Sequence, residues 1–280
     1  MAVYNWYPGH MAKAKRAMTE DIKVIDIIAE LVDARAPFST RNPDIESLGA
    51  GKERIIILNK ADLADERVTE AWVKHYEEDG LRAMALNSRD RKSFQAVKNM
   101  INSAAASKRE RDLKRGIKNR PVRLMIAGIP NVGKSTFINT LCGRNIAKTG
   151  NKPGVTKGRQ WISVAKGVDL LDTPGILWPR IEDPSSQQNL ALIGSMNDEA
   201  INMDDLYVIL AGVLMEKSGR IMSERFGAEP SDEASRILLK TAERLSMLGA
   251  GGVPDTARAM TYLFTAFRGG ELGRISLEEP

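Results

Sequence analysis

Apolar and polar positions along the first two-thirds of the chain predict strands that alternate with helices. Short apolar runs rich in Val and Ile are typical of buried strands, and amphipathic stretches with helical spacing lie between them. The expected strands span residues 24–32, 54–58, 82–86, 122–127, 161–164 and 168–171, the last two forming a hairpin. The expected helices span residues 11–22, 65–79, 93–106 and 134–141. This alternation predicts an α/β fold with a mostly parallel sheet and covering helices.

The pattern changes near residue 184. From there only helical spacing is found, with expected helices at residues 188–194, 204–217, 232–248 and 254–267. A glycine-rich break at residues 249–252 separates the last two. We therefore expect two domains, an α/β domain over residues 1–180 and a small all-α domain over residues 184–280.

Composition narrows the class of protein. The chain has 280 residues, 42% of them hydrophobic and 28% charged, which is typical of a globular protein. Its apolar runs fall short of the ~20 residues that cross a bilayer, and its first ten residues lack the layout of a secretion signal. The single cysteine, Cys142, excludes an internal disulfide and is expected to be a small core residue. We expect a cytoplasmic protein without membrane contact.

Charge is unevenly distributed along the chain. Residues 1–180 hold 32 Lys and Arg against 20 Asp and Glu, a net +12, whereas residues 181–280 hold 9 against 16, a net −7. A basic first part favours a polyanionic partner, and RNA is the natural candidate. The densest basic stretch, residues 107–120, is either a solvated helix end and linker or a contact with a phosphate backbone.

A phosphate-binding loop follows the strand at residues 122–127. Residues 128–135, Gly-Ile-Pro-Asn-Val-Gly-Lys-Ser, fit the pattern G-x-x-x-x-G-K-[ST]. In this pattern the backbone amides cradle phosphates, the lysine reaches the β- and γ-phosphate oxygens, and the hydroxyl that follows ligates Mg²⁺. The expected nucleotide contacts from this loop and the start of its helix are Asn131, Val132, Gly133, Lys134, Ser135 and Thr136.

Two further segments are expected at the γ-phosphate. Asp172-Thr173-Pro174-Gly175 ends a strand, so that Asp172 can hold Mg²⁺ through water and Gly175 can offer its amide to the γ-phosphate. Thr156 is the best-placed threonine to sense the γ-phosphate through Mg²⁺, with Thr149 and Thr173 as competitors. The predicted Mg²⁺ ligands are therefore Ser135, Thr156 and Asp172.

A guanine-reading tetrapeptide lies early in the chain, at Asn59-Lys60-Ala61-Asp62. The Asp62 carboxylate can accept hydrogen bonds from guanine N1–H and the exocyclic amine, donors that adenine lacks there. Asn59 is expected on the N7/O6 side of the base and the Lys60 stem along its plane. Asn87 and Ser88, at the end of the next strand, are expected to close the base pocket.

The order of these segments is rotated relative to other GTPases, with the guanine-reading segment first instead of last. Loops at one edge of a parallel sheet meet in space whatever their order. The sequence thus predicts a circularly permuted GTPase. Ile176 stands where many GTPases carry the glutamine that orients the attacking water, so another group must do this or hydrolysis is slow. Of the two histidines, His75 is expected on a helix surface, and His10, from its residues alone, as a helix cap or surface group.

The chain resembles the ribosome biogenesis GTPase A family of circularly permuted GTPases. The resemblance lies in the permuted order, the opening Trp6-Tyr7-Pro8-Gly9-His10-Met11, the segment Asp33-Ala34-Arg35-Ala36-Pro37 and the phosphate loop. It implies a GTPase that acts late in assembly of the bacterial large ribosomal subunit, binds ribosomal RNA and is stimulated by the particle. It also implies catalysis by His10 and a K⁺ ion near Asn131, whose alternative role is a local backbone hydrogen bond. With His10 added, the catalytic candidates are His10, Thr156 and Gly175.

Two other kinds of function stay open. One is a GTP-gated RNA-binding switch whose own hydrolysis is incidental. The other is a signalling or trafficking GTPase, disfavoured by the lack of a lipidation motif or apolar anchor. We also expect a monomer off the ribosome, and a helical region that changes its orientation when the γ-phosphate is bound.

Overall fold

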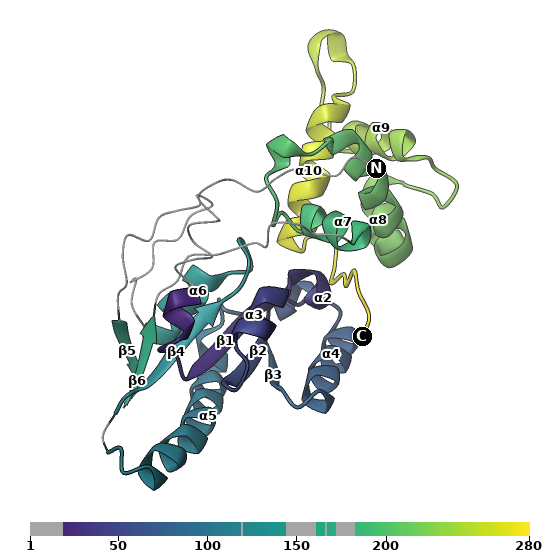
Figure 1. Ribbon diagram of the computed structural model, residues 1–280. Helices are drawn as coiled ribbons and strands as arrows, with labels where there is room; N and C mark the ends of the chain where they lie inside the picture. Colours follow the sequence, from purple (N-terminus) through teal and green to yellow (C-terminus); the bar gives the residue numbers. More distant parts are fainter. Residues whose placement is uncertain (1–18, 119, 144–160, 166, 172–182) are drawn as a thin grey trace.

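A six-stranded sheet with helices on both faces forms the first part of the molecule, and a group of helices lies beyond one end of it (Figure 1). The computed structural model describes residues 19–118, 120–143, 161–165, 167–171 and 183–280. The expected fold class, a mostly parallel sheet with covering helices followed by a helical region, is confirmed.

The sheet is parallel except at one edge. Its order is β3-β2-β1-β4-β6-β5, and only β5 is antiparallel to its neighbour. The strands are β1 (Ile27–Asp33), β2 (Glu53–Asn59), β3 (Arg82–Leu86), β4 (Val122–Ala127), β5 (Trp161–Ala165) and β6 (Val168–Leu171). The expected hairpin is therefore confirmed as β5 and β6.

Alternate residues of β1 pack on opposite faces, as the pleat of a strand requires. Ile27, Ala29 and Leu31 belong to the core under α5 (Phe94–Lys114) and α6 (Lys134–Cys142). On the other face Ile28 packs with residues of α3 (Pro43–Leu48), and Val32 packs with residues of α4 (Glu66–Glu78). Every residue of β1 is buried, which is typical of a central parallel strand.

Two short helices after β1 were not predicted. They are α2 (Pro37–Thr40) and α3, and each has a proline in its first turn, where a missing N–H costs nothing. The Asn42 side chain caps α3 by accepting from the amide of Asp44. Each helix is too short to show helical periodicity in the sequence.

Helix α5 runs eight residues further than expected, to Lys114 instead of 106. The extension carries Lys108–Asp112 and Glu110–Lys114 ion pairs at a spacing of four residues, which supports a helix. Residues 107–114 are thus the end of α5 and not a linker. A 3₁₀ turn, η2 (Arg91–Ser93), precedes α5.

The chain before β1 differs from the expectation. The strand begins at Ile27 and not at 24, because the amides of Val24 and Ile25 bond back to the carbonyls of Asp21 and Ile22 in a turn. Residues 19–22 are helical, and the rest of the helix expected at 11–22 lies outside the described residues.

The helical region contains α7 (Pro184–Leu192), α8 (Met203–Phe226), α9 (Ala234–Arg244) and α10 (Thr256–Gly269), with 3₁₀ turns η3 (Asp198–Ala200) and η4 (Ala250–Gly252). Its four helices were expected, but with other ends. Helix α8 continues past the expected end at 217 through a kink at Ser218, whose φ is −134°. The Ser218 hydroxyl donates to the carbonyl of Leu272, so the kink contacts the chain after α10.

After α10 the chain returns to the α/β part and ends beside α4 (Figure 1). The amide of Ile275 donates to the Leu63 carbonyl at 3.0 Å, and the amide of Leu277 donates to the Arg35 carbonyl at 2.7 Å. The indole N–H of Trp72 donates to the Glu278 carbonyl at 3.2 Å. The division into two domains at residues 180–184 stays a prediction, because residues 275–278 pack on the α/β part. In the described part of the chain, no helix has the length and apolar character needed to cross a bilayer.

Candidate functional site

The carboxyl ends of four neighbouring parallel strands bring those predicted site residues that the structure describes to one edge of the sheet. Asp33 ends β1 and is paired in register with Asn59, which ends β2. Asn59 is in turn paired with Leu86, the last residue of β3, and Gly128 follows β4. Ligands of open α/β sheets bind outside this edge. The described loops that carry predicted site residues therefore share this edge, and their roles at a nucleotide stay predictions.

Asn59 joins three of these loops. Its Nδ2 donates to the carbonyl of Val132 in the phosphate loop at 2.6 Å. Its Oδ1 accepts from the Ser88 amide at 3.0 Å and from the Ser88 hydroxyl at 2.7 Å. Since the Asn59 side chain is buried and its atoms are used in this way, it fixes the loops to one another. The expected contact with the N7/O6 side of a guanine stays a prediction.

The rest of the guanine-reading segment turns sharply after Asn59. Lys60 is left-handed at φ 59°, and the 3₁₀ turn η1 (Ala61–Leu63), which contains Asp62, follows it. The Lys60 ammonium lies 2.8 Å from Oδ2 of Asp33. Arg35 pairs with the same carboxylate and is almost wholly buried. The sequence marked Asp33 and Arg35 only as part of a resemblance, and gave them no role.

Asp33 is charged despite its burial. Burial alone raises the pKa of a carboxyl group, but the positive charges and hydrogen bonds of Lys60 and Arg35 outweigh it and hold the pKa of Asp33 well below its usual range. The carboxylate is therefore ionised at neutral pH, and it pairs with both cations.

Two glycines of the phosphate loop allow close approach of other segments. Gly128 has φ 148°, and a Cβ there would lie 2.6 Å from the Leu31 carbonyl oxygen. Gly133 has φ 98°, and a Cβ there would lie 2.4 Å from Nδ2 of Asn59. Glycine at these positions is thus required by the packing of the loop against β1 and β2.

Helix α6 starts at the lysine of the loop. Lys134, Ser135 and Thr136 form its first turn, where backbone amides are available to an anion. The Lys134 ammonium donates to the Ile129 carbonyl at 2.6 Å and so lies across the loop. Thr140, one turn further along, donates from its hydroxyl to the Ser88 carbonyl at 2.9 Å, which fixes α6 to the loop after β3.

Asn87 and Ser88 occupy the turn after β3. Oδ1 of Asn87 accepts from the amide of Arg89 at 2.9 Å, which is an Asx turn. Ser88 is buried and bonded to Asn59, and the expected closing of a base pocket by Asn87 and Ser88 stays a prediction.

The phosphate loop also contacts the helical region, which the sequence did not indicate. Asn131, at φ 64°, donates from Nδ2 to the carbonyl of Gly194 at 2.7 Å. Gly194 lies just after α7. The residue expected beside a K⁺ ion is therefore also a link between the two parts of the chain.

The structure does not place four predicted site residues. His10, Thr156, Asp172 and Gly175 lie outside the described residues, and so does Ile176. Their roles stay predictions. Over the ranges that are described, no group of three or more His, Cys, Asp and Glu could hold a metal ion.

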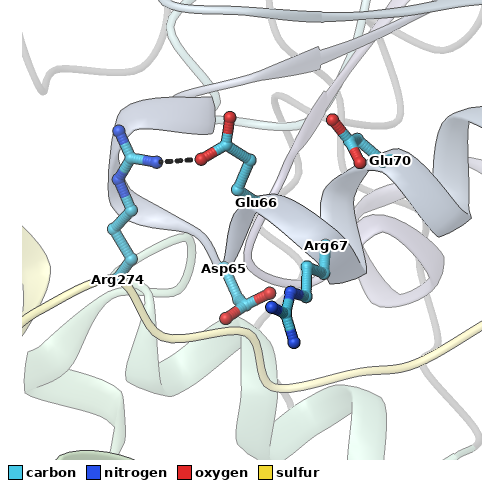
Figure 2. Close-up of a pocket in the computed structure, with 5 residues that line it drawn as sticks. All are labelled: Asp65, Glu66, Arg67, Glu70 and Arg274. Carbon is cyan, nitrogen blue, oxygen red and sulfur yellow. Dashed lines mark hydrogen bonds and ion pairs between the residues drawn. The ribbon is translucent and has the colours of Figure 1, made fainter.

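A charged pocket of about 460 Å³ lies away from these loops. Figure 2 shows it between the first turn of α4 and the returning chain, where Arg274 contacts Glu66 at 3.2 Å. The other lining residues are Asp65, Arg67 and Glu70. Its walls contain no residue of the phosphate loop or the guanine-reading segment, and we assign it no part in nucleotide binding.

Known proteins resemble this chain over nearly its whole length. A ribosome biogenesis GTPase A of Bacillus licheniformis is 42% identical over 279 residues, which are 99% of each chain. That of Thermotoga maritima is 36% identical and covers 99% of this chain and 94% of its own. A family model described as 50S ribosome-binding GTPase matches residues 123–235.

Solved structures also resemble this chain over nearly its whole length. A GDP-bound structure of TM YlqF superposes with a TM-score of 0.66 at 30% identity, over 95% of this chain and 99% of that one. A GNP-bound YlqF from T. maritima gives 0.63 at 32% identity, over 96% and 98%. With a phosphate loop and a guanine-reading segment joined through Asn59, and with relatives of this similarity across the full length, the chain belongs to the ribosome biogenesis GTPase A family and is a GTPase.

Proposed function

We propose that this GTPase hydrolyses GTP to GDP and phosphate as an assembly factor of the bacterial large ribosomal subunit. The names of the relatives state ribosome biogenesis, and the matching family is described as binding the 50S ribosome. The observation that carries the nucleotide site is the Asn59 amide, 2.6 Å from Val132 and bonded to Ser88. It bonds the base-reading segment directly to the phosphate-binding loop, as a site shared by one nucleotide requires.

Guanine is selected by Asp62. Its carboxylate accepts from N1–H and the exocyclic amine, and an adenine would leave this charged acceptor unpaired at a cost of about 3 kcal/mol or more. Lys60 lies along the base, and Asn59, Asn87 and Ser88 form the rest of the base pocket.

The phosphates bind at the start of α6. The amides of residues 131–136 surround them, Lys134 leaves the Ile129 carbonyl to reach their oxygens, and Gly175 offers its amide to the γ-phosphate. Since Ile176 has no polar group, His10 positions the attacking water and Thr156 senses the γ-phosphate. The segment order makes the domain a circular permutation of other GTPases.

Mg²⁺ fits the donors at this site. Ser135, Thr156 and Asp172 would supply hydroxyl and carboxylate oxygens, the ligands that Mg²⁺ prefers, and Ser135 lies in the first turn of α6 beside the phosphate-binding amides. Bound Mg²⁺ would neutralise charge on the phosphate oxygens.

The proposal of a K⁺ ion rests on one residue, Asn131, and is less directly supported than that of Mg²⁺. Nδ2 of Asn131 is engaged by Gly194, so its Oδ1 is the atom that would ligate the cation. Positive charge near the phosphates would then depend on a contact with the helical region.

Ribosomal RNA is the proposed macromolecular partner, and the cytoplasm the proposed location, with a monomer off the ribosome. Much of the basic stretch at residues 107–120 is neutralised within the protein, because Lys108 and Arg120 pair with Asp26, and Arg111 pairs with Glu53. Arg115 and Lys118 are exposed and follow the end of α5, and they are the better candidates for phosphate contacts.

The RNA contact has a direct test. Replacing Arg115 and Lys118 with Gln is expected to weaken binding to the large-subunit precursor and to make the slope of log affinity against log salt shallower by about 1–2. The matched control is Arg220→Gln, an exposed cation on α8 in the acidic part. An unchanged slope in the double variant would remove these residues from the RNA contact.

A substitution of His10 distinguishes an enzyme of assembly from a GTP-gated switch. If the protein is an enzyme of assembly, His10→Ala lowers GTP turnover on the particle by about 100-fold or more with unchanged GTP affinity. If the protein is instead a GTP-gated switch with incidental hydrolysis, His10→Ala leaves GTP turnover unchanged. Its activity is then seen only as sedimentation with the particle that depends on the bound nucleotide.

A further inference from the structure

Lys60 has an unusual backbone conformation beside a buried carboxylate. Its φ and ψ are 59° and 34°, a left-handed geometry that a side chain disfavours. Its ammonium lies 2.8 Å from Oδ2 of Asp33, which is fully buried, whereas the Lys60 side chain is 23% exposed. The ion pair thus ties the lysine of the guanine-reading segment to the end of β1.

Arg35 completes the carboxylate's hydrogen bonds. Its Nε and Nη2 each donate to Asp33 at 2.9 Å, to Oδ1 and Oδ2 respectively, and its backbone amide donates to Oδ1 at 3.1 Å. Each oxygen of Asp33 therefore has two donors. A two-point Arg–carboxylate contact fixes orientation as well as distance, so Asp33 presents Oδ2 to Lys60 in one direction.

The helical region encloses Arg35 from the other side. Nη1 of Arg35 donates to the Arg268 carbonyl at 3.4 Å, and the guanidinium lies 5.7 Å from the centre of the Phe267 ring. The Arg35 carbonyl accepts from the amide of Leu277 at 2.7 Å. The last turn of α10 and the returning chain thus hold Arg35 in place.

We propose that Asp33 and Arg35 are positioning residues for Lys60, and that through it they raise the affinity for guanine nucleotides without touching the base. This inference rests on the guanine-nucleotide site proposed above. A lysine whose rotamers are already restricted loses less conformational entropy when the base packs on its stem. The effect must therefore vanish when Lys60 is absent.

A double-mutant cycle on the full-length chain tests this dependence. GDP affinity is measured by calorimetry for wild type, Asp33→Asn, Lys60→Gln and the double variant. We expect each single change to weaken GDP binding about tenfold, and the double variant to bind within twofold of Lys60→Gln. A general loss of stability would act independently of Lys60, and the two effects would multiply.

Glu30→Gln is the matched control. Glu30 is a carboxylate of the same strand, equally buried, that accepts from the Asn42 amide and faces Arg41 and Arg54, none of which belongs to the nucleotide loops. Its replacement is expected to leave GDP affinity within twofold, whatever it does to the melting temperature.

Arg35→Lys carries the same test if circular dichroism shows Asp33→Asn unfolded, because it keeps the positive charge and loses the two-point contact with Asp33, together with the guanidinium contacts to Arg268 and Phe267. Multiplying effects in the cycle, or a folded Asp33→Asn with wild-type affinity, would overturn the proposal. Failure of the guanine-nucleotide site itself looks different, since wild type would then not prefer GDP to ADP.

Discussion

Nδ2 of Asn131 donates to the carbonyl oxygen of Gly194 at 2.7 Å, across 63 residues of sequence. The phosphate loop is thereby bonded to the end of α7, while the base side of the site is bonded to the end of α10 through Arg35 and Arg268. Both ends of the nucleotide site thus contact the helical region. A change of that region's orientation with the γ-phosphate would have to break or remake these contacts.

Asn131→Asp removes the side-chain N–H donor and places a carboxylate oxygen against the Gly194 carbonyl oxygen. Because aspartate tolerates a left-handed backbone, we expect a loss of about 1–2 kcal/mol in the free energy of unfolding, from the lost hydrogen bond and not from backbone strain. Amide hydrogen exchange of residues 193–195 should become faster. Asn99→Asp, at an exposed position of α5, is the control and should change neither quantity. Unchanged exchange in Asn131→Asp would show that the bond does not hold the helical region.

Gly133→Ala brings a Cβ to 2.4 Å from Asn59. We expect a loss of about 2–3 kcal/mol in stability, together with at least a hundredfold loss in GDP affinity, because Asn59 must move and the loops separate. Gly143→Ala is the matched control, since Gly143 is also left-handed at φ 67° but has no atom within 4 Å of the added Cβ. It should cost about 1–2 kcal/mol and leave GDP affinity within threefold. Equal affinities in the two variants would contradict the role of this contact.

Glu278 fastens the end of the chain to α2. Its carboxylate accepts from the amides of Phe38 and Ser39, from the Ser39 hydroxyl, and from Nδ2 of Asn189. Glu278→Ala is expected to cost about 2 kcal/mol in chemical denaturation, because charge-assisted bonds are lost and the start of α2 is uncapped. Glu279→Ala, exposed and one residue on, should stay within about 0.5 kcal/mol of wild type. A similar cost for both would mean that the returning chain is not held here.

The stability that Asp33 supplies depends on pH in a defined direction. Its pKa is held below the value of an unfolded aspartate, about 3.9, by Lys60 and Arg35 against the effect of burial. Its contribution is therefore complete above the unfolded pKa and declines as the pH falls through and below it. Asp33→Asn should cost about 3–5 kcal/mol near pH 7, and its difference from wild type should shrink between about pH 5 and pH 3. Denaturation series at several pH values measure this, and a constant difference would contradict it.

The positions of the strands and of the main loops could be predicted because each is determined locally. The apolar run of β1 and the spacing of the phosphate loop both depend on neighbouring residues, and the parallel arrangement then places Asp33, Asn59 and Gly128 at one edge.

The contacts between the two parts of the chain could not be predicted in this way. The sequence predicts a K⁺ ion or a local backbone bond for Asn131, whereas its partner in the structure, Gly194, is distant in sequence. Arg35 is buried and contacts α10 and the returning chain, which lie more than 200 residues further along the sequence. The strong charge of residues 107–120 suggested a surface for RNA, but several of these cations pair with Asp26 and Glu53, which are far away along the chain.

The most direct test of the account is calorimetric titration of the full-length protein with GDP and with ADP, for wild type and Asp62→Asn. If the Asn59–Asp62 segment and the phosphate loop bind opposite ends of one guanine nucleotide, wild type prefers GDP by at least about 100-fold, and Asp62→Asn loses most of that preference with little change toward ADP. Equal affinity of wild type for the two nucleotides, or a preference for GDP that survives Asp62→Asn, would contradict it.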